Sequence, residues 1–231
     1  MARKINPVSF RLGALQLWDF TLQNYGKLTY NSILHFYKRL QIKKVINQIL
    51  SLNRFLPGSK ELWFYNDKLF LIIYFANQSF DKNKLYSPLI ENISKIFLKY
   101  FSIETYLRVY IKTNHVLTSN LLINYTKYLL QQNKNFVKIL WYLCQFSENH
   151  LNSKKIIYSD QGIRLAYLRG FKIRLVGRFN DSRSQMAKTI QQGLEFQSLM
   201  CLRNYIEFFQ DEIHMKSGSC GLQIWLFYEL N

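Results

Sequence analysis

The sequence predicts an α+β protein built from two successive units. Amphipathic helical segments alternate with aromatic and β-branched runs, and the order helix, strand, strand, helix, strand fills about the first half of the chain before a second mixed set of elements. The 231 residues suffice for one or two hydrophobic cores. With 16% aromatic residues and only three Pro, the chain is not a disordered or low-complexity segment.

The first helix is predicted over residues 29–52, where apolar residues recur at a spacing near 3.6. Its predicted polar face carries four cations and no acidic residue, which suits a phosphate-bearing partner better than a merely solvated surface. Pro57-Gly58-Ser59 is expected to form a turn that ends this segment. The four cations are Lys38, Arg39, Lys43 and Lys44.

Two strands are predicted over residues 61–65 and 69–76, joined by a short polar connection as in a hairpin. Ser87-Pro88 is expected to begin the second helix, with Ser as the N-cap and Pro at the first helical position. Residues 105–112 alternate apolar and polar side chains, so they are predicted to form a half-buried strand.

The second unit is predicted to begin with helical segments after Thr118. Residues 156–168 are interpreted as a short helix ended by Gly170. Residues 171–178 alternate cleanly and predict a strand. The last two strands are expected over residues 202–209 and 222–228, with Asp211-Glu212 in the polar connection between them.

Charge indicates the class of partner. The chain has 31 Lys and Arg against 14 Asp and Glu, a net charge of +17. An AT-rich codon bias accounts for part of the Lys excess, but such a bias would spread charge evenly, whereas the net charge is +9 over residues 1–60, +6 over 151–183 and −2 over 184–231. The two basic blocks predict a polyanionic partner such as RNA, and the last block suits protein neighbours.

No motif supports catalysis or a cofactor. A nucleophile elbow, a phosphate loop, a dinucleotide glycine run and paired carboxylates are all missing from the sequence. Cys144, Cys201 and Cys220 lie far apart without a Cys-x-x-Cys pair, so they are interpreted as reduced thiols and no metal site is expected. The longest apolar run, residues 69–76, is too short to cross a bilayer.

Two segments resemble one protein family. Residues 2–13, ARKINPVSFRLG, are similar to the amino terminus of small-subunit ribosomal protein three, and residues 170–178, GFKIRLVGR, are similar to the strand that opens the carboxy-terminal domain of that family. Further landmarks follow in the family's order, namely Ala187-Lys188-Thr189, Leu202-Arg203, Ile206-Glu207-Phe208 and residues 219–227. Residues 14–160 match in element order rather than in identities.

The resemblance implies an amino-terminal type II KH-like domain followed by a second α+β domain characteristic of the family. We expect an extension over residues 1–28 that contacts ribosomal RNA, the KH-like domain over 29–115, and the carboxy-terminal domain over 116–231 with a helical insertion at about 133–152. A KH domain grips single-stranded backbone with a Gly-x-x-Gly loop, but the equivalent residues 77–85 contain no glycine. The loop is therefore expected to be degenerate and the domain to serve as a scaffold.

The implied function is that of a structural component in the head of the ribosomal small subunit, without enzymatic activity. Expected partners are small-subunit ribosomal RNA, messenger RNA where it enters the subunit, and neighbouring head proteins, with no membrane. Lys154 and Lys155 take the place of the family's basic cluster at the messenger channel. The expected RNA-binding residues are Arg3, Lys4, Arg11, Lys38, Arg39, Lys43, Lys44, Arg164, Arg169, Lys172, Arg174, Arg178 and Arg183.

The skewed composition and the immediate family start indicate coding in an organelle, the mitochondrion in preference to the plastid because the KH loop has decayed. Two other functions stay open at this point. A stand-alone KH-type RNA-binding or RNA-processing factor would depend on the missing loop glycines. A basic membrane-surface protein would need a helix with a lipid-facing apolar side, whereas the apolar stripes here are needed for two cores.

Overall fold

The protein is α+β and divides into two compact units, each described by itself below. The central unit is Asp19–His115, and the split unit combines Met1–Trp18 with Val116–Asn231. The structure is a computed structural model that describes residues 5–18, 29–65, 68–77, 87–101, 104–111, 118–132, 136–159, 162–179, 186–195, 198–215 and 218–230.

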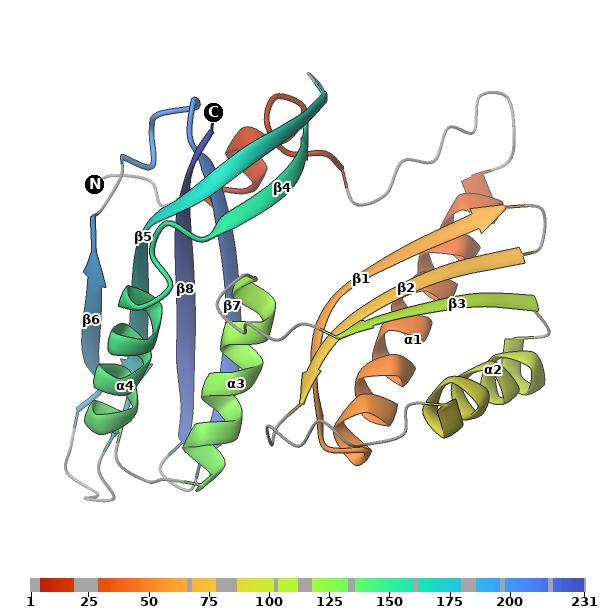
Figure 1. Ribbon diagram of the computed structural model, residues 1–231. Coiled ribbons are helices and arrows are strands. Elements are labelled where there is room, and N and C mark those ends of the chain that lie inside the picture. The colour runs from red at the N-terminus through yellow and green to blue at the C-terminus, as the bar shows by residue number, and fades with distance from the viewer. Residues whose placement is uncertain are drawn as a thin grey trace. The chain divides into compact units, whose positions relative to one another are not determined.

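In the central unit, two helices pack on one face of a three-stranded sheet (Figure 1). The strands lie in the order β1-β2-β3, with β1 antiparallel and β3 parallel to β2. The core joins Ile42 and Ile46 of α1 and Phe97 of α2 to the inward residues of β2. The elements are α1 (Thr29–Leu52), β1 (Phe55–Tyr65), β2 (Lys68–Asn77), α2 (Ser87–Phe101) and β3 (Glu104–Ile111).

The predicted helices and strands of the central unit are confirmed, with one exception. Pro57-Gly58-Ser59 was expected to be a turn, but it lies inside β1, which begins at Phe55. The pairing of β1 with β2 shifts register between Pro57 and Lys60, so these residues form an irregularity in an edge strand rather than a chain reversal. Pro lacks an N–H donor and Gly permits the bend, and both are tolerated in such a position.

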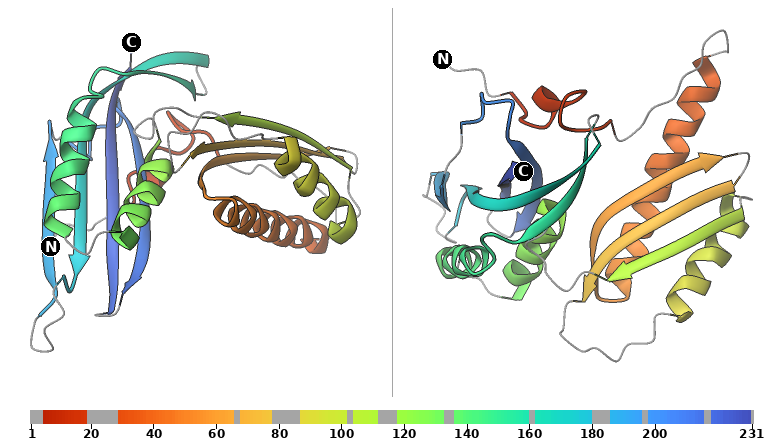
Figure 2. Two further views of the ribbon diagram at one scale, coloured as in Figure 1. Left: turned by 60° about the horizontal axis from the view of Figure 1, so that its bottom comes forward. Right: turned by 45° about the horizontal axis from the view of Figure 1, so that its top comes forward.

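In the split unit, helices α3 and α4 cover one face of a five-stranded antiparallel sheet (Figures 1 and 2). The long strand β5 pairs with β8 along one edge and with β4 and then β6 along the other. The strand β7 pairs with the free edge of β8. The elements are α3 (Ser119–Gln132), α4 (Phe136–Glu148), β4 (Lys154–Ser159), β5 (Gly162–Gly177), β6 (Lys188–Leu194), β7 (Tyr205–Met215) and β8 (Gly218–Leu230).

The helix predicted over residues 156–168 is wrong, because these residues form the hairpin of β4 and β5. The stretch holds eight apolar residues whose spacing does not by itself distinguish a helix from a strand, so the preference of the residues for one backbone conformation matters. Ile156, Ile157 and Ile163 are β-branched, which favours strands. Gly162 adopts a φ of +106°, which allows the chain to reverse between the two strands.

The last two strands exist as predicted, but Asp211-Glu212 does not connect them. Both residues lie within β7, where Asp211 faces Leu222 of β8. The Asp211 carboxylate accepts a hydrogen bond from Lys127 Nζ of α3 at 2.5 Å, so the acidic residue fixes a helix to the sheet. The strand β6 was not predicted; its sequence, Lys188–Leu194, has polar residues at most positions and lacks the apolar alternation of a buried strand.

The amino-terminal residues pack on the split unit rather than standing out from it as an extension. After a short 3₁₀ helix η1 (Ser9–Arg11), Arg11 is fully buried and Leu15 is almost so. Gln16 Nε2 donates to the carbonyl of Ile206 at 2.6 Å. Residues 5–18 therefore belong to the fold of the carboxy-terminal strands, although the central unit follows them in the sequence.

Candidate nucleic-acid interface

The helix α1 presents cations from the central unit, although fewer than its sequence suggests. Lys38 and Lys43 are partly exposed and Lys44 is exposed. Tyr37 lies two turns before Lys44 and is 61% exposed, so an aromatic ring accompanies the cations on the surface. Such a mixture suits RNA, in which phosphates and bases alternate.

Arg39 corrects the predicted polar face of α1. Its side chain is only 6% exposed, because residue 39 falls on the same helical face as Ile42 and Ile46, which belong to the core. The expectation that Arg39 binds phosphate on the surface is therefore wrong.

Lys60 of β1 adds a cation that the sequence did not single out. Its Nζ donates to the carbonyl of Lys43 at 3.2 Å and to Oδ1 of Asn47. Burial, with a smaller contribution from the charge of Lys43, lowers the pKa of the Lys60 ammonium to about 8. Two neighbouring ammonium groups that repel each other favour a nearby anion, and a phosphate would relieve that repulsion. No sequence signal identifies this pair, because residue 60 lies between the predicted turn at 57–59 and the predicted strand at 61–65.

On β5 of the split unit, Lys172 and Arg174 point to the sheet face opposite the buried Phe171 and Ile173, as the alternation predicted. The Nζ of Lys172 lies 5.5 Å from the ring centroid of Trp225. Arg174 lies opposite Gln223, and its buried Nε has no hydrogen-bond partner among the described residues. The residue as a whole is partly exposed, so its charge stays near the surface of the sheet.

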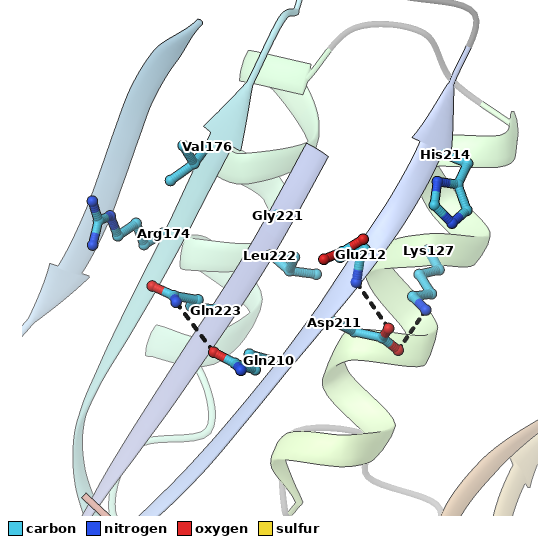
Figure 3. A pocket seen from close by; sticks show the side chains of 10 residues that line it. All are labelled: Lys127, Arg174, Val176, Gln210, Asp211, Glu212, His214, Gly221, Leu222 and Gln223. Carbon is cyan, nitrogen blue, oxygen red and sulfur yellow. Dashed lines mark hydrogen bonds and ion pairs between the residues drawn. The ribbon is translucent and has the colours of Figure 1, made fainter. Parts of the chain in front are cut away.

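Around Arg174 the open sheet face forms a shallow depression with mixed polar side chains (Figure 3). Gln223 and Gln210 hydrogen-bond to each other across β8 and β7 at 3.4 Å. The depression also includes Glu212 and His214. Because the amides can both donate and accept, this surface suits nucleic acid without marking a base-specific site.

The strand β4 places the two lysines predicted at the messenger channel, Lys154 and Lys155, on opposite faces. Lys155 forms an ion pair with Glu207, and the second carboxylate oxygen of Glu207 accepts from the backbone N–H of Ser119 at 3.2 Å. Both side chains are less than one-fifth exposed, so Lys155 stabilises the joint between β4, β7 and α3. Its assignment to messenger RNA is wrong. The neighbouring Lys154 points to the opposite face of the strand and is exposed.

The remaining arginines differ in their exposure to solvent. Arg169 occupies the register shift of β5 and bonds to Glu229 Oε2 at 2.6 Å and to Asn152 Oδ1 at 3.1 Å. Arg178 is exposed at the end of β5, and Arg164 is partly exposed. Arg3, Lys4, Arg183 and most of the loop at 77–85 lie outside the described residues.

Arg11 is the clearest correction among the predicted RNA-binding residues. Its guanidinium donates to the carbonyls of Pro7, Leu199, Cys201 and Asn204 at 2.5 to 3.1 Å. A fully buried guanidinium with four carbonyl acceptors is an internal clamp, and it has no surface from which to reach phosphate.

Within the described residues, the side chains give no sign of a metal or redox centre. Clusters of three or more potential metal ligands are absent there, and all three cysteines are free thiols. Burial and the nearby Glu148 raise the pKa of Cys144 to about 11, which weakens it as a nucleophile. In the same ranges, every helix is too short or too polar to span a membrane.

Comparison with known proteins identifies the family. No family model matches the chain. The chain is 41% identical over 228 residues to the small ribosomal subunit protein uS3m of Chondrus crispus, which covers 99% of this chain and 94% of that protein. It is 24% identical over 237 residues to the small ribosomal subunit protein uS3c of Euglena longa, covering 98% and 99% of the two chains. Identity of this degree over nearly the full length shows that the chain belongs to the uS3 family of small ribosomal subunit proteins, as an organelle-encoded member of the mitochondrion.

Proposed function

We propose that this protein is a structural, non-enzymatic component of the mitochondrial small ribosomal subunit, where it binds ribosomal RNA in the head. The observation that carries the proposal is the similarity to uS3m, which covers 99% of this chain and therefore extends through both units. The net charge of +17 supports it, because a protein held on folded RNA needs cations on its surface.

The central unit serves as a KH-like scaffold in this proposal. Its order of helix, strand, strand, helix, strand and its mixed sheet support the assignment. The sequence of residues 77–85 lacks the glycines that let a KH loop approach the phosphate backbone closely. RNA contact is therefore assigned to α1 and its neighbour Lys60 rather than to the loop.

The surface cations define two RNA-binding patches, one in each unit. The patch of the central unit consists of Lys38, Lys43, Lys44 and Lys60. The patch of the split unit consists of Lys172, Arg174 and Arg178, with Arg164 as a further candidate. Arg11 and Arg39 are left out because they are buried, and Lys155 because its ion pair with Glu207 leaves its side chain only 18% exposed.

A place near the entering messenger RNA is the finer part of the proposal. After the internal pairing of Lys155, only Lys154 of the predicted pair remains exposed for this role. Its Nζ lies 5.9 Å from the ring centroid of Tyr167, which holds the cation over an aromatic surface. Replacing Lys154 by Glu should impair translation of structured messengers more than assembly of the subunit. Equal defects in both would contradict the assignment.

Sedimentation tests the main proposal. A tagged chain in a mitochondrial lysate should migrate with the small subunit, and brief ribonuclease treatment should release it because RNA holds it in place. Migration as a free protein would contradict the ribosomal function. Migration with an RNA-processing particle would favour a stand-alone RNA-binding factor instead.

A further inference from the structure

The central unit leaves one face of its sheet uncovered. Both helices, α1 and α2, lie on one side of the sheet (Figure 2). The core residues Leu69, Leu71 and Ile73 face that side, so the alternate residues of the strands point away from the core. We call this side the aromatic face. It consists of Trp63 of β1, Phe70, Ile72 and Tyr74 of β2, and Tyr106, Arg108 and Tyr110 of β3.

The aromatic face exposes several large rings. Trp63 is 63% exposed, Tyr106 49% and Tyr110 46%. The strand register aligns Trp63, Phe70 and Tyr106 in one row, so the rings form a continuous patch rather than scattered residues. Contiguous exposed apolar surface of this kind marks an interaction site.

The orientation of the rings argues against a platform for RNA bases. The rings of Phe70 and Tyr106 are nearly parallel at 14°, with centroids 5.1 Å apart, and those of Tyr74 and Tyr110 are 5.5 Å apart at 22°. Nearly parallel rings at this distance form an offset stack, because two rings lying side by side flat on the sheet would need more room. Their faces are turned toward each other, so an incoming base meets ring edges instead of a stacking surface.

The distribution of charge also argues against RNA as the partner of the aromatic face. On and beside the aromatic face, the cations Lys68 and Arg108 are accompanied by Glu61, and the Lys68 ammonium already lies 5.6 Å from the Tyr106 ring centroid. The other described cations of the unit include Lys38, Lys44, Lys95 and Lys99, which all lie on the helices. Phosphate affinity requires clustered cations, so the helical side suits RNA and the sheet side does not.

We propose that the aromatic face docks a neighbouring protein of the small subunit, through an apolar segment that presents a carboxylate to Arg108. Trp, Tyr and Arg are the residues that dominate the binding energy of protein interfaces. Arg108 has neither a hydrogen bond nor an ion pair with any described residue, so its charge needs a partner once water is excluded. This inference rests on the proposed function in the small subunit.

Photocrosslinking in assembled subunits tests the proposal. In one variant of the tagged full-length chain, a residue with a diazirine side chain replaces Tyr106. In a second variant, the matched control, the same residue replaces Lys44 of α1. Small subunits are isolated by sedimentation and irradiated. We expect the adduct at position 106 to resist ribonuclease and to contain one small-subunit protein, joined through a peptide with an acidic residue. The adduct at position 44 should be sensitive to ribonuclease.

Charge reversal then tests the role of Arg108 in the same assay. R108E should lower the yield of the protein adduct at position 106 about tenfold, because a buried ion pair becomes a repulsion. K99E, the same charge change on α2, should leave the yield unchanged. An RNA adduct at position 106, no adduct in sedimented subunits, or an unchanged yield in R108E would each overturn the docking proposal while leaving the ribosomal function standing. A chain that does not sediment with the subunit would contradict the function itself.

Discussion

Arg11 shows how a single residue joins the two ends of the chain. Its guanidinium donates hydrogen bonds to four backbone carbonyls, three of which belong to residues 199–204. Burial lowers its pKa, yet guanidinium stays charged at every pH that the fold tolerates. The burial of this charge is offset by its hydrogen bonds, and the segment around η1 is thereby held on the split unit.

Replacing Arg11 by Ala should destabilise the split unit by about 3 kcal/mol, because four buried carbonyls would lose their donor. Arg11→Lys should recover little of this, since one ammonium cannot span four acceptors in the geometry of a planar fork. Urea unfolding followed by circular dichroism measures both effects. Arg203→Ala, an exposed arginine beside the same acceptors, is the control and should change stability by no more than about 0.5 kcal/mol. An Arg11→Ala protein as stable as this control would contradict the clamp.

The lowered pKa of Lys60 predicts that the stability of the protein depends on pH in the alkaline range. Its folded pKa of about 8 lies below the ordinary 10.5, so the unfolded chain binds more protons between these values. The buried charge therefore lowers the free energy of unfolding by its full amount below pH 8. This destabilisation disappears as the pH rises toward 10.5. Lys60→Met should be more stable than the natural protein by about 1 kcal/mol at pH 7, and the difference should shrink by pH 10. A difference in urea midpoints that stays constant from pH 7 to 10 would refute the burial of the charge.

At the scale of elements, β5 organises the split unit because it pairs with three other strands. Two of its glycines, Gly170 within the strand and Gly177 at its end, allow neighbouring groups to approach closely. A Cβ at Gly170 would lie 2.4 Å from the carbonyl oxygen of Glu195, and one at Gly177 would lie 2.3 Å from Cys220 Sγ. The first contact is with backbone, which cannot move aside, so glycine is required for the approach of β6.

Gly170→Ala should therefore weaken the pairing of β6 with β5 and cost about 2 to 4 kcal/mol of stability. Gly221→Ala on β8 is a matched control, because its Cβ would meet only Val176 O at 3.9 Å. Hydrogen exchange should show the amides of residues 188–194 losing protection first in the Gly170 variant. Equal exchange and equal urea midpoints in the two variants would show that the close approach does not matter.

The corrected surface of α1 gives a prediction about RNA binding. Reversing the charges of Lys38 and Lys44 to Glu should weaken binding to small-subunit ribosomal RNA by at least about tenfold without loss of the helical spectrum, since neither residue belongs to the core. Reversing Lys95 and Lys99 on α2 makes the same change in net charge and should cost much less. Filter binding measures the affinities. Equal losses would show that net charge alone, and not the face of α1, determines the affinity.

For the whole molecule, the two basic patches predict a strong dependence of RNA affinity on salt. About four phosphate contacts would lower the association constant roughly a hundredfold between 50 and 200 mM salt, because each contact releases condensed counterions. The double variant of Lys38 and Lys44 should have a shallower slope of log affinity against log salt. An affinity that hardly changes over this range would contradict phosphate contacts as the basis of binding.

The sequence by itself determined the regular elements of the central unit and the outward face of Lys172 and Arg174, because helical and strand periodicity are local properties of the chain. It also identified the family from the motifs at its two ends. It did not resolve residues 156–168, where the apolar spacing is ambiguous and the pairing of β4 with β5, extended by β8 from Ala166 on, forms strands. Only the tertiary structure decided that Arg11 and Lys155 are internal. Their partners lie far away in sequence, and whether a cation meets phosphate or a buried acceptor depends on which distant groups the fold brings to it.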